Sequence, residues 1–319
     1  MAGEATETES TSDVRSKKST LGDWLGLIRF SHTLFAMPFA ILATVMAFAT
    51  PLPSGESATF RVLDVVAILL CMVTARSAAM AFNRLIDRDI DAKNPRTESR
   101  HLPAGRLTPG SVALFTAMNT LGFVASTLLF LPNWVPLAGS GPVLAVLLGY
   151  SLAKRFTSAA HLWLGVALSL SPLCAWLAIR GPESLSSPTD LLAPAMLACA
   201  VAAWVTGFDI IYACQDADFD RQAKLHSVPA HLGIAGALRV AAGSHIAMLL
   251  FLAVLPWSQP DVGFGWLYGI AFVLIAALVI RQHVLVSPSD LRRVGEAFFQ
   301  TNIAISIVLM VIGSIDSIW

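Results

Sequence analysis

A long apolar run ends in a cluster of acids between Leu191 and Asp220, a stretch that reads LLAPAMLACAVAAWVTGFDIIYACQDADFD. About 20 mostly apolar residues are enough to cross the bilayer core as a helix. Asp209 lies inside this run, and an ionisable side chain within a membrane span is costly in lipid and typical of a functional site. The stretch therefore predicts a membrane helix that carries acidic side chains toward one surface of the bilayer.

The whole chain shares this apolar character. Its 319 residues are 55% hydrophobic and 13% charged, with a mean hydropathy of +0.68, whereas an ordinary soluble domain is about 25% charged. The 21 basic and 21 acidic residues balance, so no surplus of positive charge is left to bind a nucleic acid. The four cysteines form no CxxC or Cys/His cluster, which excludes a disulfide framework and a thiolate zinc site.

Apolar runs of membrane-spanning length recur along the sequence. Because unpaired backbone groups are costly in lipid, each run must be helical. We therefore expect an all-α polytopic membrane protein with about nine transmembrane helices, in which a disordered tail (1–20) precedes a single transmembrane domain (21–319). The nine predicted spans lie at about 30–50, 62–82, 110–131, 135–153, 160–179, 190–213, 235–256, 264–281 and 297–315.

The basic residues set the orientation of these spans, because Lys and Arg near the ends of spans stay on the cytoplasmic side. With the N-terminus inside, most of the 21 basic residues fall in inside segments, and the outside ends carry only Arg61 and Arg180. The sequence predicts an integral protein of the cytoplasmic (inner) membrane. Its N-terminus and the two acidic loops, at about 83–109 and 214–234, would face the cytoplasm.

The first acidic loop begins with NRLIDRDID, residues 83–91. Four-residue steps place Asn83, Asp87 and Asp91 on one face if the second span continues as a helix past the membrane. Carboxylates at this spacing repel each other unless a cation lies between them. The pattern therefore indicates a divalent metal site.

The second acidic loop contains DIIYACQD, residues 209–216. Tyr212 and Asp216 follow Asp209 at helical spacing, so a second acidic wall can lie opposite the first. Hard oxygen ligands without nearby His or Cys favour Mg²⁺, whose shell is commonly completed by phosphate oxygens and water. We expect Mg²⁺ as the cofactor and a diphosphate as the substrate.

Basic and polar residues on the same side can bind the diphosphate oxygens that the metal leaves exposed. Some of the basic side chains are explained equally well as charges that only orient the chain in the membrane. The candidates for diphosphate binding are Arg96, Arg100, Tyr150, Ser151, Lys154, Arg155, Tyr212 and Lys224.

These motifs resemble those of the UbiA superfamily of intramembrane prenyltransferases, which carry NxxxDxxxD and DxxYxxxD. The matching segments are Asn83–Asp91 and Asp209–Asp216. The stretches RTESRHLPAG (96–105), YSLAKRFT (150–157) and KLHSVPAHLG (224–233) are also similar to segments of this family. The likeness extends over nearly the whole membrane region.

The resemblance implies helices around a central cavity, a polyprenyl diphosphate donor and catalysis by Asp87, Asp91 and Asp209. It further implies that Asn83, Asp87 and Asp91 hold one Mg²⁺ and that Asp209 with Asp216 holds another. The acceptor would be a small aromatic acid such as 4-hydroxybenzoate, used in quinone biosynthesis. No obligate protein partner is evident.

Acceptor binding is assigned to Arg29 and His32, which interrupt the first apolar run. The surrounding RFSHTLFAMPFA (29–40) looks more like the branch linked to menaquinone synthesis by the futalosine route than like the RLDKPIG-type segment of 4-hydroxybenzoate enzymes. A naphthoate or futalosine-derived acceptor is therefore the alternative. His161 and His245 are interpreted as structural.

A cation-coupled membrane transporter is the alternative of a different class, because intramembrane acids also serve such carriers. A transporter would place its acids near the membrane midplane. In this sequence the acids cluster at the cytoplasmic ends of the spans, which favours the enzyme.

Overall fold

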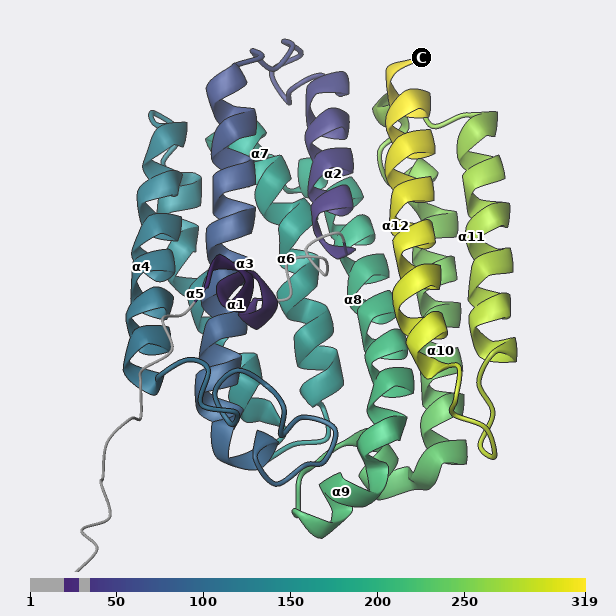
Figure 1. Ribbon diagram of the computed structural model, residues 1–319. Helices are drawn as coiled ribbons and strands as arrows, with labels where there is room; N and C mark the ends of the chain where they lie inside the picture. The colour runs from purple at the N-terminus through teal and green to yellow at the C-terminus, as the bar shows by residue number, and fades with distance from the viewer. Residues whose placement is uncertain (1–19, 29–34) are drawn as a thin grey trace, which may run out of the picture.

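Eight helices are long and apolar enough to cross a bilayer in the part of the chain that the computed structural model describes, residues 20–28 and 35–319 (Figure 1). A ninth, α2 (Met37–Ala49), is shorter and occupies the place of the first predicted span. The expected bundle of about nine apolar helices is confirmed. The long helices are α3 (Val62–Asp91), α4 (Pro109–Thr127), α5 (Val135–Ala153), α6 (Ala160–Arg180), α8 (Leu192–Ala213), α10 (Val228–Ser258), α11 (Trp266–Val284) and α12 (Val294–Ile318).

Short elements join or flank these helices. Thr20 caps the first of them and accepts a hydrogen bond from the backbone N–H of Asp23. It is the only residue of the predicted tail (1–20) that falls within the described chain. Among the short elements are α1 (Leu21–Leu27), α7 (Pro182–Ser186) and α9 (Ala217–Gln222), with 3-10 turns η2 (Leu128–Phe130), η3 (Pro188–Leu191), η4 (Cys214–Asp216) and η5 (Pro260–Val262).

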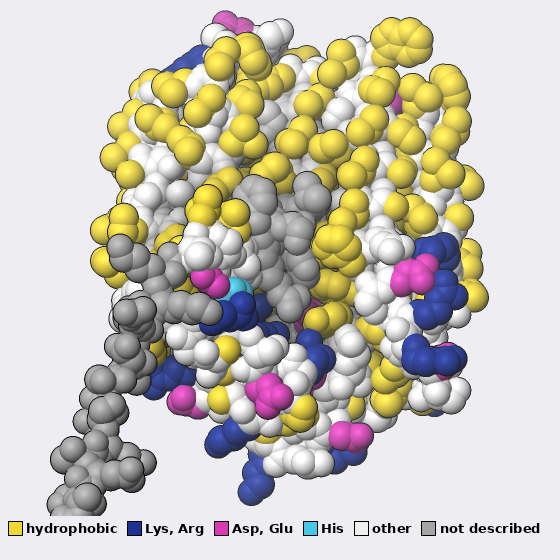
Figure 2. All heavy atoms as spheres, in the orientation of Figure 1, with side chains coloured by type: hydrophobic (Ala, Val, Ile, Leu, Met, Phe, Trp, Pro, Cys, Tyr) yellow, Lys and Arg dark blue, Asp and Glu magenta, His cyan; other side chains and the backbone are white. Residues whose placement is uncertain are grey.

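Helix α3 is longer than the membrane is thick. Its 30 residues span about 45 Å, whereas the hydrocarbon core is about 30 Å thick. The last turns of α3 therefore pass beyond the apolar layer, as the motif Asn83–Asp91 requires. Figure 2 shows the same division: hydrophobic side chains cover most of the visible face, and charged ones gather at its lower end.

Helix α8 lies at the centre of the packing. It contacts α6, α10 and α12, and it contributes fully buried Trp204 to the main core. Gly165 of α6 allows a close crossing, because a Cβ at this position would lie 2.4 Å from the carbonyl oxygen of Ala202. The two helices that will carry His161 and Asp209 are thus held in tight contact.

A buried ion pair closes the end of the bundle opposite the acidic motifs. Arg180, at the end of α6, is 3% exposed and donates from Nε to Asp190 over 2.9 Å. Its Nη1 also donates to the carbonyl of Thr50 over 2.7 Å, and Trp176 donates to Asp190 over 3.0 Å. This cluster, called the Arg180 plug below, ties α6 to the end of α2.

Candidate active site

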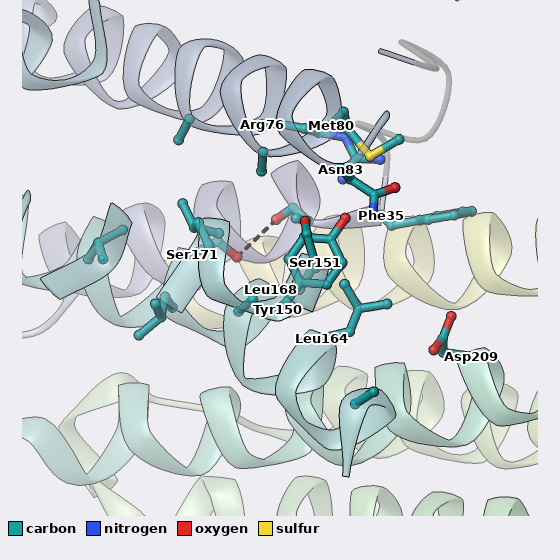
Figure 3. Close-up of a pocket in the computed structure, with 18 of the residues that line it drawn as sticks. Phe35, Arg76, Met80, Asn83, Tyr150, Ser151, Leu164, Leu168, Ser171 and Asp209 are labelled. Atoms are coloured by element: carbon teal, nitrogen blue, oxygen red, sulfur yellow. Dashed lines mark hydrogen bonds between the residues drawn. The ribbon is translucent and has the colours of Figure 1, made fainter. Parts of the chain in front are cut away.

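A cavity of about 550 Å³ lies between α3, α5, α6 and α8 (Figure 3). Acids and bases line the end at which the two acidic motifs meet, and apolar side chains such as Ile68, Phe123 and Leu173 line the depth. On α6 the lining runs from Ala160 to Ala178, about 27 Å along the helix axis. The cavity therefore suits a long molecule with a charged head and an apolar tail.

The first wall of the charged end is the last part of α3. Asn83 donates from Nδ2 to Asp87 over 2.9 Å, and Asp91 accepts two hydrogen bonds from Arg100, at 2.6 and 2.8 Å. Arg155 lies 3.4 Å from Asp87. The predicted acids therefore share one face of a continuous helix, and each already has a basic partner.

The second wall is formed by Asp216 and its partners. Asn94 donates to Asp216 over 3.1 Å, and Arg96 forms a bidentate ion pair with the same carboxylate. Arg96 also donates to the Tyr212 hydroxyl over 3.0 Å. Residues of the first acidic loop thus reach across to the second motif, so the two motifs form one site.

The charge of Arg96 is secured by this pairing. Burial on its own lowers the pKa of Arg96, but the hydrogen bond and the negative charge of Asp216 outweigh burial and hold the pKa above its ordinary value. The guanidinium stays charged and positions the Asp216 carboxylate.

The other predicted residues fall into three groups. Tyr150, Ser151 and Lys154 line the cavity with the residues named above. Lys224 does not line it, and its backbone has a φ of 55°. Arg29 and His32 lie outside the described residues, so their assigned role stays a prediction.

Asp209 lies deeper in the cavity than Asp216, the last residue of its motif. It lies seven residues before Asp216, which is about 10 Å along the axis of a helix. His161 approaches its Oδ2 atom at 2.6 Å through Nδ1. Asp209 lines the cavity and has a histidine, rather than an arginine, as its hydrogen-bond partner.

The cavity contains functional groups that the sequence motifs missed. The Oδ2 atom of Asp220 is buried without a hydrogen-bond partner, and so is the Nε atom of Arg76. Asp220 repeats the four-residue step from Asp216, a signal that was present in the sequence. Arg76 lies seven residues before Asn83 on the face of α3 that lines the cavity, so helical spacing could have identified it too (Figure 3).

The donor set fits Mg²⁺ bound together with a phosphate group. Five carboxylates line the charged end, and one of them, buried Asp220, has an oxygen without a hydrogen-bond partner. Within the described ranges, no three His, Cys, Asp or Glu side chains converge as a preformed metal site. In Mg²⁺ sites that bind phosphorylated substrates, one or two carboxylates bind the ion and substrate phosphates complete the shell.

Comparison with known proteins assigns the family. Residues 36–304 match the UbiA prenyltransferase family. The chain belongs to this family. A UbiA-family protein is a prenyltransferase embedded in the membrane, and this assignment decides against the transporter alternative.

Two curated relatives illustrate the range of UbiA-family enzymes to which the chain is similar. It is 28% identical over 255 residues to the polyprenyl transferase ntnF of Nectria sp, covering 79% of this chain and 78% of the relative. It is 29% identical over 244 residues to a 4-hydroxybenzoate octaprenyltransferase of Nitrosomonas europaea, covering 74% and 77%.

Solved structures share the UbiA fold. The apo structure of a UbiA homolog from Aeropyrum pernix K1 is 32% identical with a TM-score of 0.76, covering 87% of this chain and 95% of that chain. A UbiA homolog from Archaeoglobus fulgidus, bound to DMAPP and Mg²⁺, is 18% identical with a TM-score of 0.61, covering 89% and 98%. The second likeness concerns the fold alone.

Proposed function

We propose that this UbiA-family enzyme transfers a polyprenyl group from a polyprenyl diphosphate to a small aromatic acid of the 4-hydroxybenzoate type, as a step of quinone biosynthesis. The observation that carries the proposal is Arg76. Arg76 lines the cavity about 10 Å deeper along α3 than Asn83, and its Nε atom is buried without a hydrogen-bond partner. A guanidinium at this depth requires an anion, and a planar carboxylate matches it in a bidentate pair.

The donor diphosphate would lie at the charged end. Arg100 and Arg155 pair there with the α3 acids, and Arg96 pairs with Asp216, while Lys154 also lines this end. These cations can turn from carboxylate to phosphate oxygens as the ligand enters. The apolar depth beside them suits the prenyl tail, because each buried CH₂ contributes about 0.8 kcal/mol.

Mg²⁺ is the proposed cofactor. Asn83, Asp87 and Asp91 would hold one ion, and Asp216 with the unpartnered Asp220 would hold a second. When bound, the metal draws electron density from the diphosphate and so favours loss of this group. The sequence assigns Asp209 to the second ion together with Asp216; we propose Asp220 in that place and proton transfer as the role of the Asp209 carboxylate.

The residues then support a substitution at the allylic carbon. The C–O bond to the diphosphate breaks, and a ring carbon of the acceptor forms the new C–C bond. The cationic side chains stabilise the departing negative charge. Asp209 receives the proton that the ring loses, and the apolar walls exclude water, which would otherwise capture the allylic cation.

We place the charged end of the cavity in the cytoplasm, at the inner membrane. The excess of Lys and Arg on this side of the spans supports that orientation. A water-soluble aromatic acid and the diphosphate head could then both reach the site from the cytoplasm, while the prenyl tail remains in the apolar layer.

The deciding experiment is prenyl transfer by the purified protein in detergent. Radiolabelled geranyl or longer prenyl diphosphate is supplied with a panel of aromatic acceptors, in Mg²⁺ or in EDTA. Label on 4-hydroxybenzoate that requires Mg²⁺ supports the proposal. Transfer only to a naphthoate or futalosine-derived compound indicates the menaquinone alternative, and transfer only to acceptors without a carboxylate overturns the role given to Arg76.

A further inference from the structure

His161 lies behind Asp209, outside the cavity. Its side chain is 1% exposed and does not line the cavity, whereas the Asp209 side chain lines it and is 20% exposed. The contact between them joins Nδ1 of His161 to Oδ2 of Asp209 at 2.6 Å. His161 therefore acts on the cavity through a side chain that lines it, that of Asp209.

The second ring nitrogen determines which tautomer His161 adopts. The backbone N–H of Val228 donates to His161 Nε2 over 3.3 Å, so Nε2 must be the acceptor. The ring is then neutral, and its proton resides on Nδ1, from which it is donated to Asp209. Asp209 is thus held by one oriented hydrogen bond, which engages Oδ2 and leaves Oδ1 for the cavity.

Two features of the fold bring these groups together. Gly165, one turn after His161 on α6, permits the close approach to α8 that places the ring beside Asp209. Val228 is the first residue of α10 and follows the segment that carries Asp220. In this segment the backbone N–H of His226 donates to the carbonyl of Lys154 over 2.7 Å. His161 therefore links Asp209 to the loops that enclose the charged end.

We propose that His161 is a positioning residue for prenyl transfer: it fixes the orientation of Asp209, so that the free carboxylate oxygen faces the acceptor ring and receives its proton. This inference rests on the proposed function. It departs from the structural interpretation that the sequence favoured for His161. It also predicts an effect on turnover rather than on donor binding, because the cations that would hold the diphosphate do not contact His161.

The test compares two substitutions. In His161→Gln the amide can still donate to Asp209 and accept from Val228, whereas His161→Leu removes both hydrogen bonds. We expect His161→Leu to lower kcat by roughly 10- to 100-fold, the size of effect expected from losing a hydrogen bond to a charged group. The KM for the prenyl diphosphate should stay within about twofold of wild type, and His161→Gln should recover most of the lost kcat.

The control is His245→Leu. His245 is also 1% exposed but contacts His283 and the Trp204 carbonyl, away from the cavity lining. It reports the effect of removing a buried histidine, and its kcat should match wild type even if its melting temperature falls. If His161→Leu does not fold, Val228→Pro replaces it, because proline is tolerated at the first helical position, lacks the N–H that fixes the tautomer and keeps an apolar side chain at this partly buried position. Val228→Pro should also lower kcat.

The assays use whichever acceptor the wild-type protein prenylates. A different acceptor class would therefore revise the proposed function without affecting this comparison. A wild-type kcat in folded His161→Leu, or equal losses in the Leu and Gln variants, would overturn the inference.

Discussion

Arg96 donates a hydrogen bond from Nε to Oδ1 of Asp216 over 2.8 Å, although 120 residues separate them in the sequence. The same guanidinium lies over the Tyr212 ring, 5.2 Å from its centroid. One side chain from the loop after α3 thus organises the acidic motif at the end of α8. The two motifs become a single site only through contacts of this kind.

Replacing Arg96 by Lys tests this contact. Lysine keeps the charge but cannot form the bidentate pair, so we expect kcat/KM for the prenyl diphosphate to fall about tenfold, equivalent to about 1.4 kcal/mol. Steady-state kinetics with varied donor measures it. Arg221→Lys is the matched control, because Arg221 pairs with exposed Asp218 and does not line the cavity. Equal effects of the two substitutions would contradict the role of Arg96.

The metal-binding role proposed for Asp87 and Asp91 can be tested with Asp89, which lies between them on α3, as the control. Asp87→Asn or Asp91→Asn should abolish Mg²⁺-dependent transfer while the protein still inserts in the membrane, because each removes a proposed ligand charge. Asp89→Asn should retain activity, since the Asp89 side chain is 80% exposed and points away from the other two. Near-normal turnover in Asp91→Asn would refute the metal assignment on this wall.

The second wall also offers a proposed metal ligand and a nearby exposed acid that serves as its control. Asp220 is buried and lines the cavity, whereas Asp218, two residues before it, is 88% exposed at its side chain. We expect Asp220→Asn to raise the Mg²⁺ concentration needed for half-maximal transfer at least about tenfold, consistent with the loss of one charged ligand. Asp218→Asn should leave the Mg²⁺ titration unchanged. Overlapping titrations for Asp220→Asn and wild type would exclude Asp220 as a ligand.

Acceptor recognition is tested at Arg76. In Arg76→Gln the KM for an aromatic acid should rise by roughly 10- to 100-fold, because a charged hydrogen bond contributes about 1.5–3 kcal/mol, while the KM for the donor changes little. A carboxamide analogue of the acid should lose less on this substitution than the acid itself. Arg29→Ala is measured alongside, since the sequence assigns acceptor binding to Arg29. A donor KM that rises as much as the acceptor KM would argue against both assignments.

Helical spacing along the sequence was enough to predict the membrane helices and the shared face of the α3 acids. The four-residue step through Asn83, Asp87 and Asp91 needed only a continuing helix, and α3 supplies it. The expected span at 190–213 likewise agrees with α8. Both inferences depend on neighbours within one helix, where spacing determines which side chains share a face.

Contacts between distant elements could not be predicted in this way. The four-residue step from Asp216 points to Asp220, but η4 interrupts the helical phase after Asp209, so spacing alone does not show that Asp209 and Asp220 line the same cavity. The partners of Asp209 and Asp216 come from α6 and from the loop after α3, which no spacing reveals. The seven-residue spacing to Asn83 places Arg76 on the motif's face of α3, but only the surrounding helices show that this face lines a cavity.

The Arg180 plug closes one end of the bundle and leaves the charged end as the polar entrance to the cavity. Because the bundle is closed by buried Arg180 and Asp190 at one end, a bound molecule cannot pass straight through to the opposite aqueous phase. Under the proposed function, the diphosphate would therefore leave on the side where it entered, and the prenylated product would leave sideways between helices into the hydrocarbon layer. A cavity that is charged at one end, apolar along its depth and closed at the other end would thus release a polar product to water and an apolar product to lipid.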